Sequence, residues 1–369
     1  MFKLNKSLYG LKQSSKCWNN KINDFLLNLG FKRSNNDYCL YSKVHKNEIV
    51  YLLLYVDDII LTGPDLHHIE YYKTKLTNEF DVKDKGELKN FLGLEIIYDK
   101  MKGILKINQK RYILGILKRF NFENCKPCLT PIEPRLKLTM SENNNKNGKP
   151  IKEMIGCLMY LMLGSRPDLS FAVNFFSRYQ DKYSDEIWNY LKRVLRYLKG
   201  TINLSLVYVR KKEEYPLICY VDSDWGGDLY DRKSVSGYLI KIFGNTISWV
   251  TRKQNCVALS TTEAELIALC SSVVDGLWFK KLLLDLNIMI NYFSIYEDNQ
   301  ACISLIKNPE NNRRVKHIDL KYNFVCENIK KNIIKVEYTS SETQQADMLT
   351  KGLPNPSFYK NCKAVGLQR

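Results

Sequence analysis

Four acidic residues in the last third of the chain stand at the ends of expected strands or near the start of an expected helix. They are Asp222, Glu265, Asp298 and Asp347. Separate carboxylates on elements that otherwise bury apolar faces are costly unless a cation neutralises them. Mg²⁺ prefers carboxylate and water oxygens, with Mn²⁺ as the alternative, and two such ions about 4 Å apart could activate a water and stabilise a leaving 3′ oxygen. On position alone, the other interpretation is four ordinary surface acids.

The elements that must position these acids follow one another between residues 217 and 338. Apolar runs predict strands at 217–221, 236–242, 246–250, 294–296 and 335–338. A long helix is expected at 261–286, another begins near 299, and a third covers 319–331. Three antiparallel strands followed by β–α pieces predict an α/β sandwich around a mixed five-stranded sheet.

A second acidic pair, Asp57 and Asp58, separates two apolar runs near the start of the chain. The runs cover 49–55 and 59–61. Two short apolar runs joined by a few polar residues are typical of a β-hairpin, so both acids are expected at its tip. The first segment of the chain is therefore predicted to be mixed α/β.

Residues 150–200 are expected to be helical, with basic residues on one helix surface. The apolar positions follow helical spacing: Leu191, Val194, Leu195 and Leu198. Much of the remaining surface carries Arg193, Arg196 and Lys199. Two interpretations stay open, because a solvated amphipathic helix and a helix that contacts phosphates can have the same composition.

The bulk composition bounds the class of protein. The chain has 369 residues, 45% of them hydrophobic, and a formal net charge of +17. This length allows two or three domains, and the charge favours a polyanionic partner, either nucleic acid or an anionic membrane surface. Eleven cysteines form no framework, and the pair Cys125 and Cys128 cannot complete a zinc site alone, so free thiols are expected. Without a signal peptide or a long apolar run, the chain is expected to be soluble and intracellular, with no membrane partner.

Several longer motifs resemble the ribonuclease H domain of copia-type LTR retrotransposon Pol polyproteins. In the family's order these are YVDSDWGGD, SGYLIKIFGNTISWVTRKQNCVALSTTEAELIAL, YEDNQACISL, RRVKHIDLKYNF and VEYTSSETQQADMLTKGLP. The resemblance places the family's four metal-binding acids on Asp222, Glu265, Asp298 and Asp347. It implies an Mg²⁺-dependent ribonuclease acting on RNA/DNA hybrids. Asp224 and Asp228 share the first motif, either as supports of the ligands or as exposed loop acids.

The segment before residue 200 resembles the reverse transcriptase of the same family. The matching stretches are KSLYGLKQSSKCW, YVDD, FLGLEI, SRPDLSFAVN and LKRVLRYLKGT. The resemblance makes Asp57 and Asp58 metal-binding acids near a primer terminus, and primer–template nucleic acid a partner. Because Met1 lies almost on the first motif, the family's fingers, its first palm strand and a third aspartate are expected to lie upstream. We therefore expect a truncated palm and thumb with weak or no polymerase activity, unless an upstream Pol segment completes it in trans.

A basic cluster accompanies the fourth ribonuclease H motif. It consists of Arg313, Arg314, Lys316 and His317. We interpret it as a phosphate-contacting group, with a solvated or structural role as the alternative. His317 is not assigned as a general acid.

These patterns predict four segments: a partial reverse transcriptase at 1–140, a helical connection at 141–213, a ribonuclease H domain at 214–355 and a polar tail at 356–369. The resemblance implies a cytoplasmic location, in a virus-like particle, or a nuclear one. Two functions compete with an active ribonuclease: a catalytically inactive relic that binds nucleic acid, and a polymerase that works only when upstream sequence completes it.

Overall fold

The computed structural model describes residues 7–8, 10–46, 48–138, 148–181, 183–211, 216–307 and 318–369. The chain divides into two compact units. One comprises Met1–Leu88 with Trp278–Met289, and the other comprises Lys89–Leu277 with Ile290–Arg369. The predicted segment limits at 140/141 and 213/214 do not separate compact units and stay predictions about functional segments. All eleven cysteines are free thiols, and none of the helices in the described ranges is long and apolar enough to cross a membrane.

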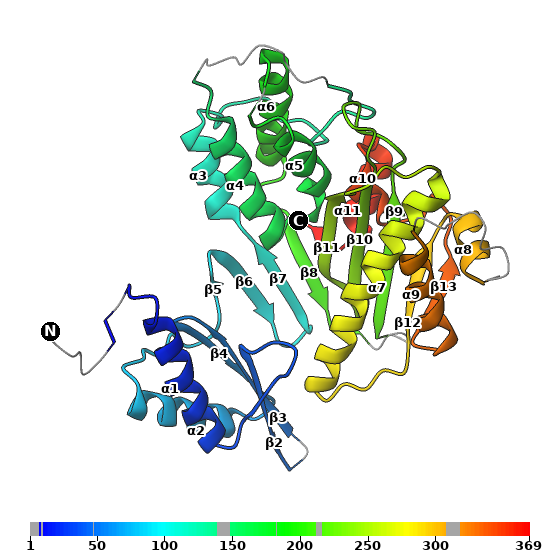
Figure 1. Ribbon diagram of the computed structural model, residues 1–369. Helices are drawn as coiled ribbons and strands as arrows, with labels where there is room; N and C mark the ends of the chain where they lie inside the picture. Colours follow the sequence, from blue (N-terminus) through cyan, green and yellow to red (C-terminus); the bar gives the residue numbers. More distant parts are fainter. Residues whose placement is uncertain are drawn as a thin grey trace, which may run out of the picture. The chain divides into compact units, whose positions relative to one another are not determined.

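The first unit is an antiparallel sheet of order β1-β2-β3-β4 with two helices (Figure 1). Its elements are α1 (Ser14–Asn28), β1 (Lys32–Arg33), β2 (Leu40–His45), β3 (Glu48–Tyr55), β4 (Asp58–Thr62) and α2 (Leu66–Glu79). Alternate residues of β3 are buried, namely Val50, Leu52 and Leu54. They share one core with apolar residues of α1 and α2. The predicted hairpin is confirmed, because Tyr55 pairs with Asp58 across its tip.

The last turns of the long helix α7 (Thr261–Asp285) belong to this first unit. Asp285 Oδ2 accepts hydrogen bonds from the Ser34 hydroxyl at 2.6 Å, from the Asn36 side chain at 2.9 Å and from two backbone amides. These hydrogen bonds lower the pKa of Asp285 despite its partial burial. The Tyr51 hydroxyl donates to the Leu286 carbonyl at 2.7 Å. Side-chain hydrogen bonds therefore hold the helix end in this unit.

The second unit contains all the remaining elements. They are β5 (Asn90–Phe91), β6 (Leu94–Asp99), β7 (Ile104–Asn108), α3 (Lys110–Arg119), α4 (Ile151–Gly164), η1 (Pro167–Leu169), α5 (Ser170–Ser177), α6 (Asp185–Gly200), β8 (Ser205–Val209), β9 (Leu217–Ser223), β10 (Val235–Ile242), β11 (Asn245–Lys253), most of α7, β12 (Phe293–Glu297), α8 (Gln300–Lys307), α9 (Asp319–Lys330), β13 (Ile334–Tyr338), α10 (Asp347–Thr350), α11 (Asn355–Ala364) and β14 (Leu367–Gln368).

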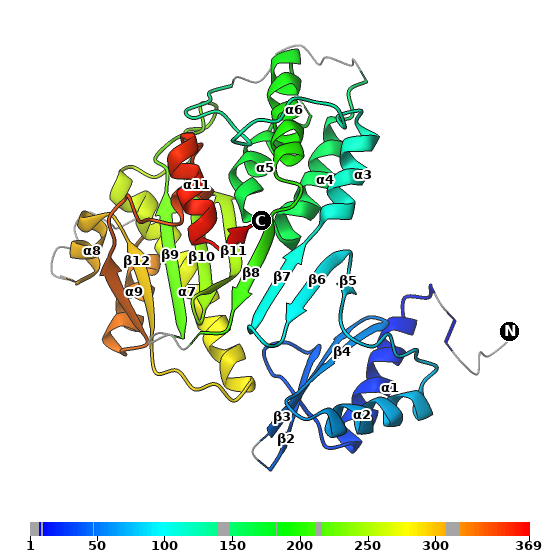
Figure 2. The same cartoon turned by 180° about the vertical axis from the view of Figure 1, so that it is seen from behind.

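A mixed five-stranded sheet of order β11-β10-β9-β12-β13 confirms the fold class predicted for this segment. β11, β10 and β9 are antiparallel neighbours, whereas β12 runs parallel to both β9 and β13. α7 crosses one face of the sheet (Figure 1), and α11 lies over the opposite face (Figure 2). α7 comes very close to the sheet at Gly276, where a Cβ would stand 2.4 Å from the ring of Phe293.

A second five-stranded sheet, β14-β8-β7-β6-β5, is not predicted by the sequence patterns. It joins strands from three distant parts of the chain, and β14 pairs with β8 through Leu367 and Leu206. The predicted polar tail at 356–369 is therefore wrong. Phe358, Cys362 and Val365 lie at i, i+4 and i+7, and all three are buried in the main core. The many polar residues between them mask this amphipathic helix in the sequence.

The helical segment at 150–200 is confirmed, and a buried ion pair fixes its centre. Arg166 and Asp168 have side-chain exposures of 1% and 0% and lie 2.7 Å apart. The Tyr197 hydroxyl of α6 donates to Asp168 at 2.6 Å, and Arg166 donates to the Thr201 hydroxyl at 2.8 Å. The SRPDLS motif thus ties η1 to the end of α6. The predicted apolar stripe of α6 is also confirmed, because Leu191, Val194, Leu195 and Leu198 are all fully buried.

Candidate metal centre

Three strand and helix ends bring the predicted acids together. β9 and β12 are parallel neighbours in which Tyr220 pairs with Tyr296. When this register is continued by two residues along both strands, Asp222 lies level with Asp298, which directly follows β12. Glu265 lies in the first turns of α7. One ligand oxygen from each of these three acids lies within 4.8 Å of the other two.

Burial makes this cluster electrostatically unfavourable without a cation. Asp222 is 2% exposed and Glu265 is 6% exposed. Burial raises the pKa of Asp222 to about 7, with a further increase from Asp347, while Lys351 opposes it. Burial, followed by repulsion from Glu297 and Asp222, raises the pKa of Glu265. Glu265 Oε2 is buried and has no hydrogen-bond partner among the described residues.

Asp347, the fourth predicted acid, joins the cluster through a lysine. It opens α10, and its Oδ1 lies 2.9 Å from Lys351 Nζ, which also lies 3.5 Å from Asp222 Oδ2. The Thr350 hydroxyl donates to Asp222. α10 approaches β10 closely because Gly237 lacks a side chain: a Cβ there would stand 2.6 Å from Thr350 Cγ2. The ammonium group of Lys351 therefore contacts both Asp222 and Asp347 and balances part of their negative charge.

Two further residues belong to this centre and are absent from the sequence prediction. Glu297, the last residue of β12, is fully buried, and its Oε2 has no hydrogen-bond partner within the described ranges. Burial and the charges of Asp222 and Asp298 raise its pKa to about 8. Gln344 is also fully buried and donates to the Val221 carbonyl at 2.8 Å, which holds the segment before Asp347 against β9. In the sequence, the signal that could have identified Glu297 is its position directly before Asp298.

The donor set fits a hard divalent cation. Asp222, Glu265 and Asp298 offer only oxygen atoms, and one buried carboxylate oxygen has no other partner. Mg²⁺ takes carboxylate oxygens and retains waters, which suits the half-buried Asp298 on the open side. The Ser341 hydroxyl orients Asp298 by donating to its Oδ2 at 2.6 Å. A second ion next to Asp347 would replace or displace the ammonium of Lys351.

We predict that Mg²⁺ changes the pH dependence of stability. The folded pKa of Asp222, about 7, exceeds its usual 3.8, so the folded state binds more protons between these values. Without a divalent cation, the free energy of unfolding should therefore fall as pH rises from about 4 to about 7, and the raised pKa of Glu297, about 8, should extend the fall to about pH 8. Bound Mg²⁺ favours the ionised form and should flatten this decline. Urea unfolding in EDTA and in Mg²⁺ across this range tests it, and identical slopes would contradict it.

Asp57 and Asp58 lie at the tip of the β3–β4 hairpin, as predicted. Asp57 is exposed, and Asp58 lies 3.7 Å from Lys85 Nζ. Val56 between the strands has a positive φ of 52°, and its carbonyl accepts a hydrogen bond from the Trp18 indole at 2.8 Å. Among the described residues, no third ligand-type side chain joins these two acids in a metal-sized cluster.

The basic residues of α6 have different roles from one another. Arg193 uses its guanidinium to donate to the Thr130 carbonyl at 3.1 Å and to Glu133 at 3.0 Å, and Arg196 donates to the Lys126 carbonyl at 2.8 Å. Both arginines therefore hold the segment before residue 134 against the helix. The sequence suggested either a solvated helix or a helix that contacts phosphates, and neither includes hydrogen bonds from Arg193 and Arg196 to the chain's own backbone. Such hydrogen bonds leave no pattern in a sequence.

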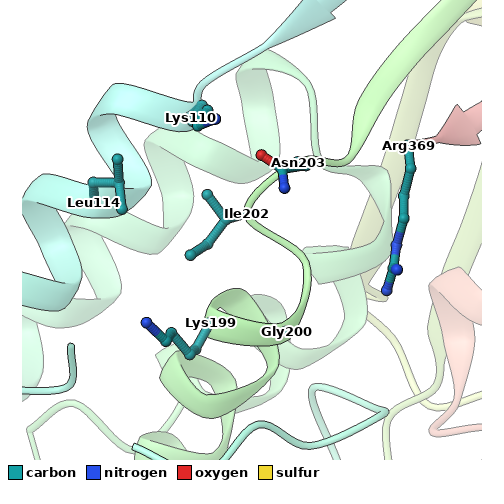
Figure 3. A pocket seen from close by; sticks show the side chains of 7 residues that line it. All are labelled: Lys110, Leu114, Lys199, Gly200, Ile202, Asn203 and Arg369. Atoms are coloured by element: carbon teal, nitrogen blue, oxygen red, sulfur yellow. The ribbon is translucent and has the colours of Figure 1, made fainter. Parts of the chain in front are cut away.

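Lys199 instead lines a pocket of about 340 Å³ together with Lys110 and Arg369 (Figure 3). These three cations come from α6, α3 and the residue after β14. Three basic residues from distant parts of the chain therefore line this pocket.

The basic cluster of the fourth motif, Arg313, Arg314, Lys316 and His317, lies outside the described residues. The remaining acids of the first motif are structural. Asp228 is buried and pairs with Arg178 at 3.1 Å and with Lys253. Asp224 accepts a hydrogen bond from the Val235 amide and thereby holds β9 to β10.

The fold and site define a protein with a ribonuclease H-like sheet and a reverse-transcriptase-type hairpin. The family model described as reverse transcriptase (RNA-dependent DNA polymerase) matches residues 1–134. Two solved structures also match parts of the chain. An RNase H1 crystallised with an RNA/DNA hybrid is 14% identical, covers 36% of this chain and 93% of its own, with a TM-score of 0.29. A foamy viral protease–reverse transcriptase with dsDNA is 12% identical, covers 90% of this chain and 60% of its own, with a TM-score of 0.45.

Curated relatives extend over nearly the whole chain. The retrovirus-related Pol polyprotein from transposon TNT 1-94 of Nicotiana tabacum is 38% identical over 99% of this chain and 28% of its own length. The Pol polyprotein from transposon RE1 of Arabidopsis thaliana is 36% identical over 100% of this chain and 25% of its own. An uncharacterized mitochondrial protein of Arabidopsis thaliana is 35% identical over 62% of this chain and 94% of its own. The chain belongs to the copia-type retrotransposon Pol family and spans about a quarter of the length of these Pol polyproteins.

Proposed function

We propose that the metal centre hydrolyses the RNA strand of RNA/DNA hybrids with Mg²⁺ as cofactor. One observation carries this proposal: Asp222, Glu265 and Asp298 converge from three elements to within 4.8 Å, with Asp347 linked through Lys351. Bound Mg²⁺ would supply an activated water and stabilise the charge on the leaving 3′ oxygen. Mn²⁺ should substitute, because its preferred ligands are the same oxygens.

The protein's own residues bind and orient in this reaction. Asp222 and Glu265 are held by a strand and a helix, so they would hold a bound cation in place before substrate binds. Asp298 lies on the more open side and is oriented by Ser341. Lys351 balances the charge of Asp222 and Asp347 while the substrate is absent, and its half-exposed side chain can swing toward a phosphate.

Substrate binding is proposed to rest on phosphate contacts. The net charge of +17 favours a polyanion, and the pocket of Lys110, Lys199 and Arg369 gathers three cations. RNA selectivity would come from contacts with the 2′-hydroxyl in the wide minor groove of the hybrid. Affinity should therefore fall steeply with salt concentration.

The test is cleavage of a labelled RNA/DNA hybrid by the purified chain in Mg²⁺. Matched single-stranded RNA, double-stranded DNA and an EDTA sample serve as controls. Cleavage confined to the RNA of the hybrid, and abolished by EDTA, is the expected result. Tight, salt-sensitive binding without cleavage would instead support the inactive binding relic.

The reverse-transcriptase segment is proposed to have weak or no polymerase activity in this chain. Two acids, rather than a cluster of three, gather at the hairpin tip within the described residues. Two ions that clamp the attacking and leaving oxygens need more carboxylate ligands than Asp57 and Asp58 supply. Primer extension on a poly(rA) template should give little product. Robust synthesis by the chain alone would overturn this prediction, and synthesis only after addition of an upstream Pol segment would show completion in trans.

A further inference from the structure

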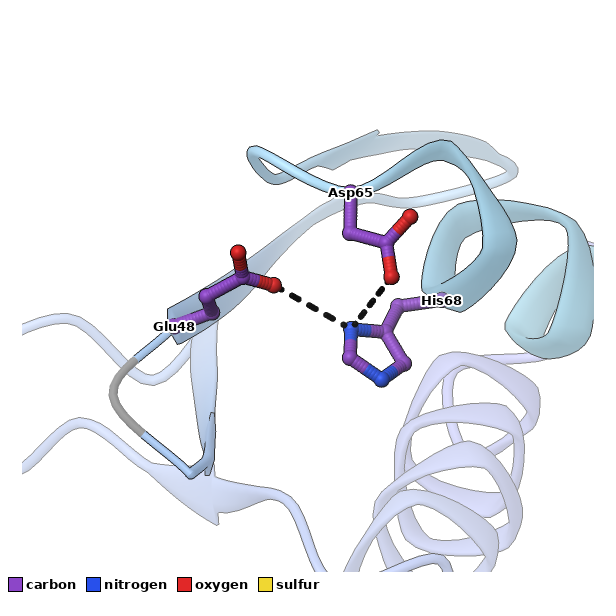
Figure 4. Close-up of side chains that lie close together, drawn as sticks. All are labelled: Glu48, Asp65 and His68. Carbon is purple, nitrogen blue, oxygen red and sulfur yellow. Dashed lines mark ion pairs between the residues drawn. The ribbon is translucent and has the colours of Figure 1, made fainter.

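A mixed cluster of ligand-type side chains lies in the first unit, apart from the carboxylate centre. Glu48 begins β3, Asp65 precedes α2, and His68 lies in the first turn of α2. Each offers one ligand atom, and the three atoms lie within 4.8 Å of one another. Figure 4 shows both carboxylates directed at the same ring nitrogen of His68.

The two carboxylates lie at ion-pair distances from the imidazole, and these separations also suit ligands of one shared cation. His68 Nδ1 lies 3.6 Å from Glu48 Oε2 and 3.4 Å from Asp65 Oδ2. Both distances exceed the range of about 2.7–3.2 Å for an N–H···O hydrogen bond. Ligands about 2.0–2.2 Å from a tetrahedral zinc ion stand about 3.3–3.6 Å from each other. The two measured separations therefore match neighbouring ligands of one metal ion.

His68 Nδ1 gives a second, independent observation. The atom is shielded from solvent and has no hydrogen-bond partner among the described residues. The ring is fixed by edge-to-face packing on His45, with centroids 4.3 Å apart. A buried polar atom without a partner is costly, and metal coordination would satisfy it. Asp65 is oriented as well, because its Oδ1 accepts the capping hydrogen bond from the His67 amide at 2.9 Å.

We infer that Glu48, Asp65 and His68 form a site for a first-row transition-metal cation such as Zn²⁺. The imidazole distinguishes this site from the all-oxygen centre, because nitrogen ligands favour Zn²⁺ over Mg²⁺. Two carboxylates and a neutral imidazole balance the charge of a divalent ion, and water completes the coordination. The ion joins the β2–β3 hairpin to the start of α2, so its role is to stabilise the first unit. This role is independent of hybrid cleavage.

The test measures Zn²⁺ binding to the full chain in excess Mg²⁺, which occupies the all-oxygen centre. Calorimetric titration compares the parent with His68→Asn and with the control His67→Asn, whose exposed ring lies on the same helix outside the cluster. His68→Asn should weaken Zn²⁺ binding more than about 100-fold, beyond the about 10–100-fold typical of changes to the partners of ligands. His67→Asn should retain one Zn²⁺ at parental affinity, and hybrid cleavage should not change in either variant.

Two further variants guard against misfolding. Asp65→Asn keeps a capping side chain but removes the charge, and Glu48→Gln keeps the length of the side chain. Both should weaken Zn²⁺ binding, and Zn²⁺ should raise the thermal midpoint of the parent but not of these variants. Co²⁺ in place of Zn²⁺ should give a visible absorption band that is lost in His68→Asn. Equal Zn²⁺ binding by the parent and all cluster variants, or equal loss in His67→Asn, would overturn the inference.

Discussion

Asp222→Asn should lower the rate of hybrid cleavage by about 1000-fold or more. The substitution removes a metal-binding carboxylate, and bound metal ions stabilise the transition state by several kcal/mol. The side chain lies at the centre of the cluster, in contact with Thr350 and Lys351 and close to Glu265 and Asp298. Single-turnover cleavage of a labelled hybrid at saturating protein measures the loss directly. Asp298→Asn should behave similarly.

Asp224→Asn is the matched control for this experiment. It lies two residues away in the same motif, and its carboxylate accepts a hydrogen bond from the Val235 amide, which asparagine can also accept. Its cleavage rate should stay within a few-fold of the parent. In EDTA, Asp222→Asn should fold at least as stably as the parent, because it relieves repulsion among buried acids. If Asp222→Asn cleaved the hybrid at the rate of the parent, the metal centre would not be the site of the reaction.

The second large effect is structural and concerns the buried ion pair of the helical segment. Asp168→Ala should destabilise the protein by about 3–5 kcal/mol, because it leaves the charge of Arg166 buried without its partner. Arg166 is 1% exposed, and the same substitution removes the acceptor of the Tyr197 hydroxyl. The urea midpoint of the second unit measures the loss.

A double variant separates the ion pair from simple loss of packing. Arg166→Met with Asp168→Leu replaces both charges by apolar side chains, which often costs little or stabilises. The double variant should therefore be more stable than Asp168→Ala alone. Glu327→Ala serves as the surface control, because Glu327 and Lys331 are each 60% exposed and such pairs contribute little. Equal stability of Asp168→Ala and the parent would contradict a structural role for the motif.

Local sequence patterns predicted the elements of the ribonuclease H-like segment well. Strands at 217–221 and 335–338 and the helix at 319–331 differ from β9, β13 and α9 by at most two residues at either end. Alternation, helical periodicity and turn residues act over short distances, so a sequence displays them directly. The same reasoning failed at 356–369, where three apolar residues are buried in a core built from distant parts of the chain.

The sequence by itself determined which acids are present and at which strand and helix ends they stand. Only the tertiary structure decided that Asp222, Glu265 and Asp298 share one site, that Asp347 reaches it through Lys351, and that Glu297 adds a further buried carboxylate. It also decided that Arg193 binds its own chain and that His68 meets two carboxylates. The physical reason is the range of the interactions: element formation depends on near neighbours, whereas ion pairs, desolvation and metal ligation depend on residues that only folding brings together.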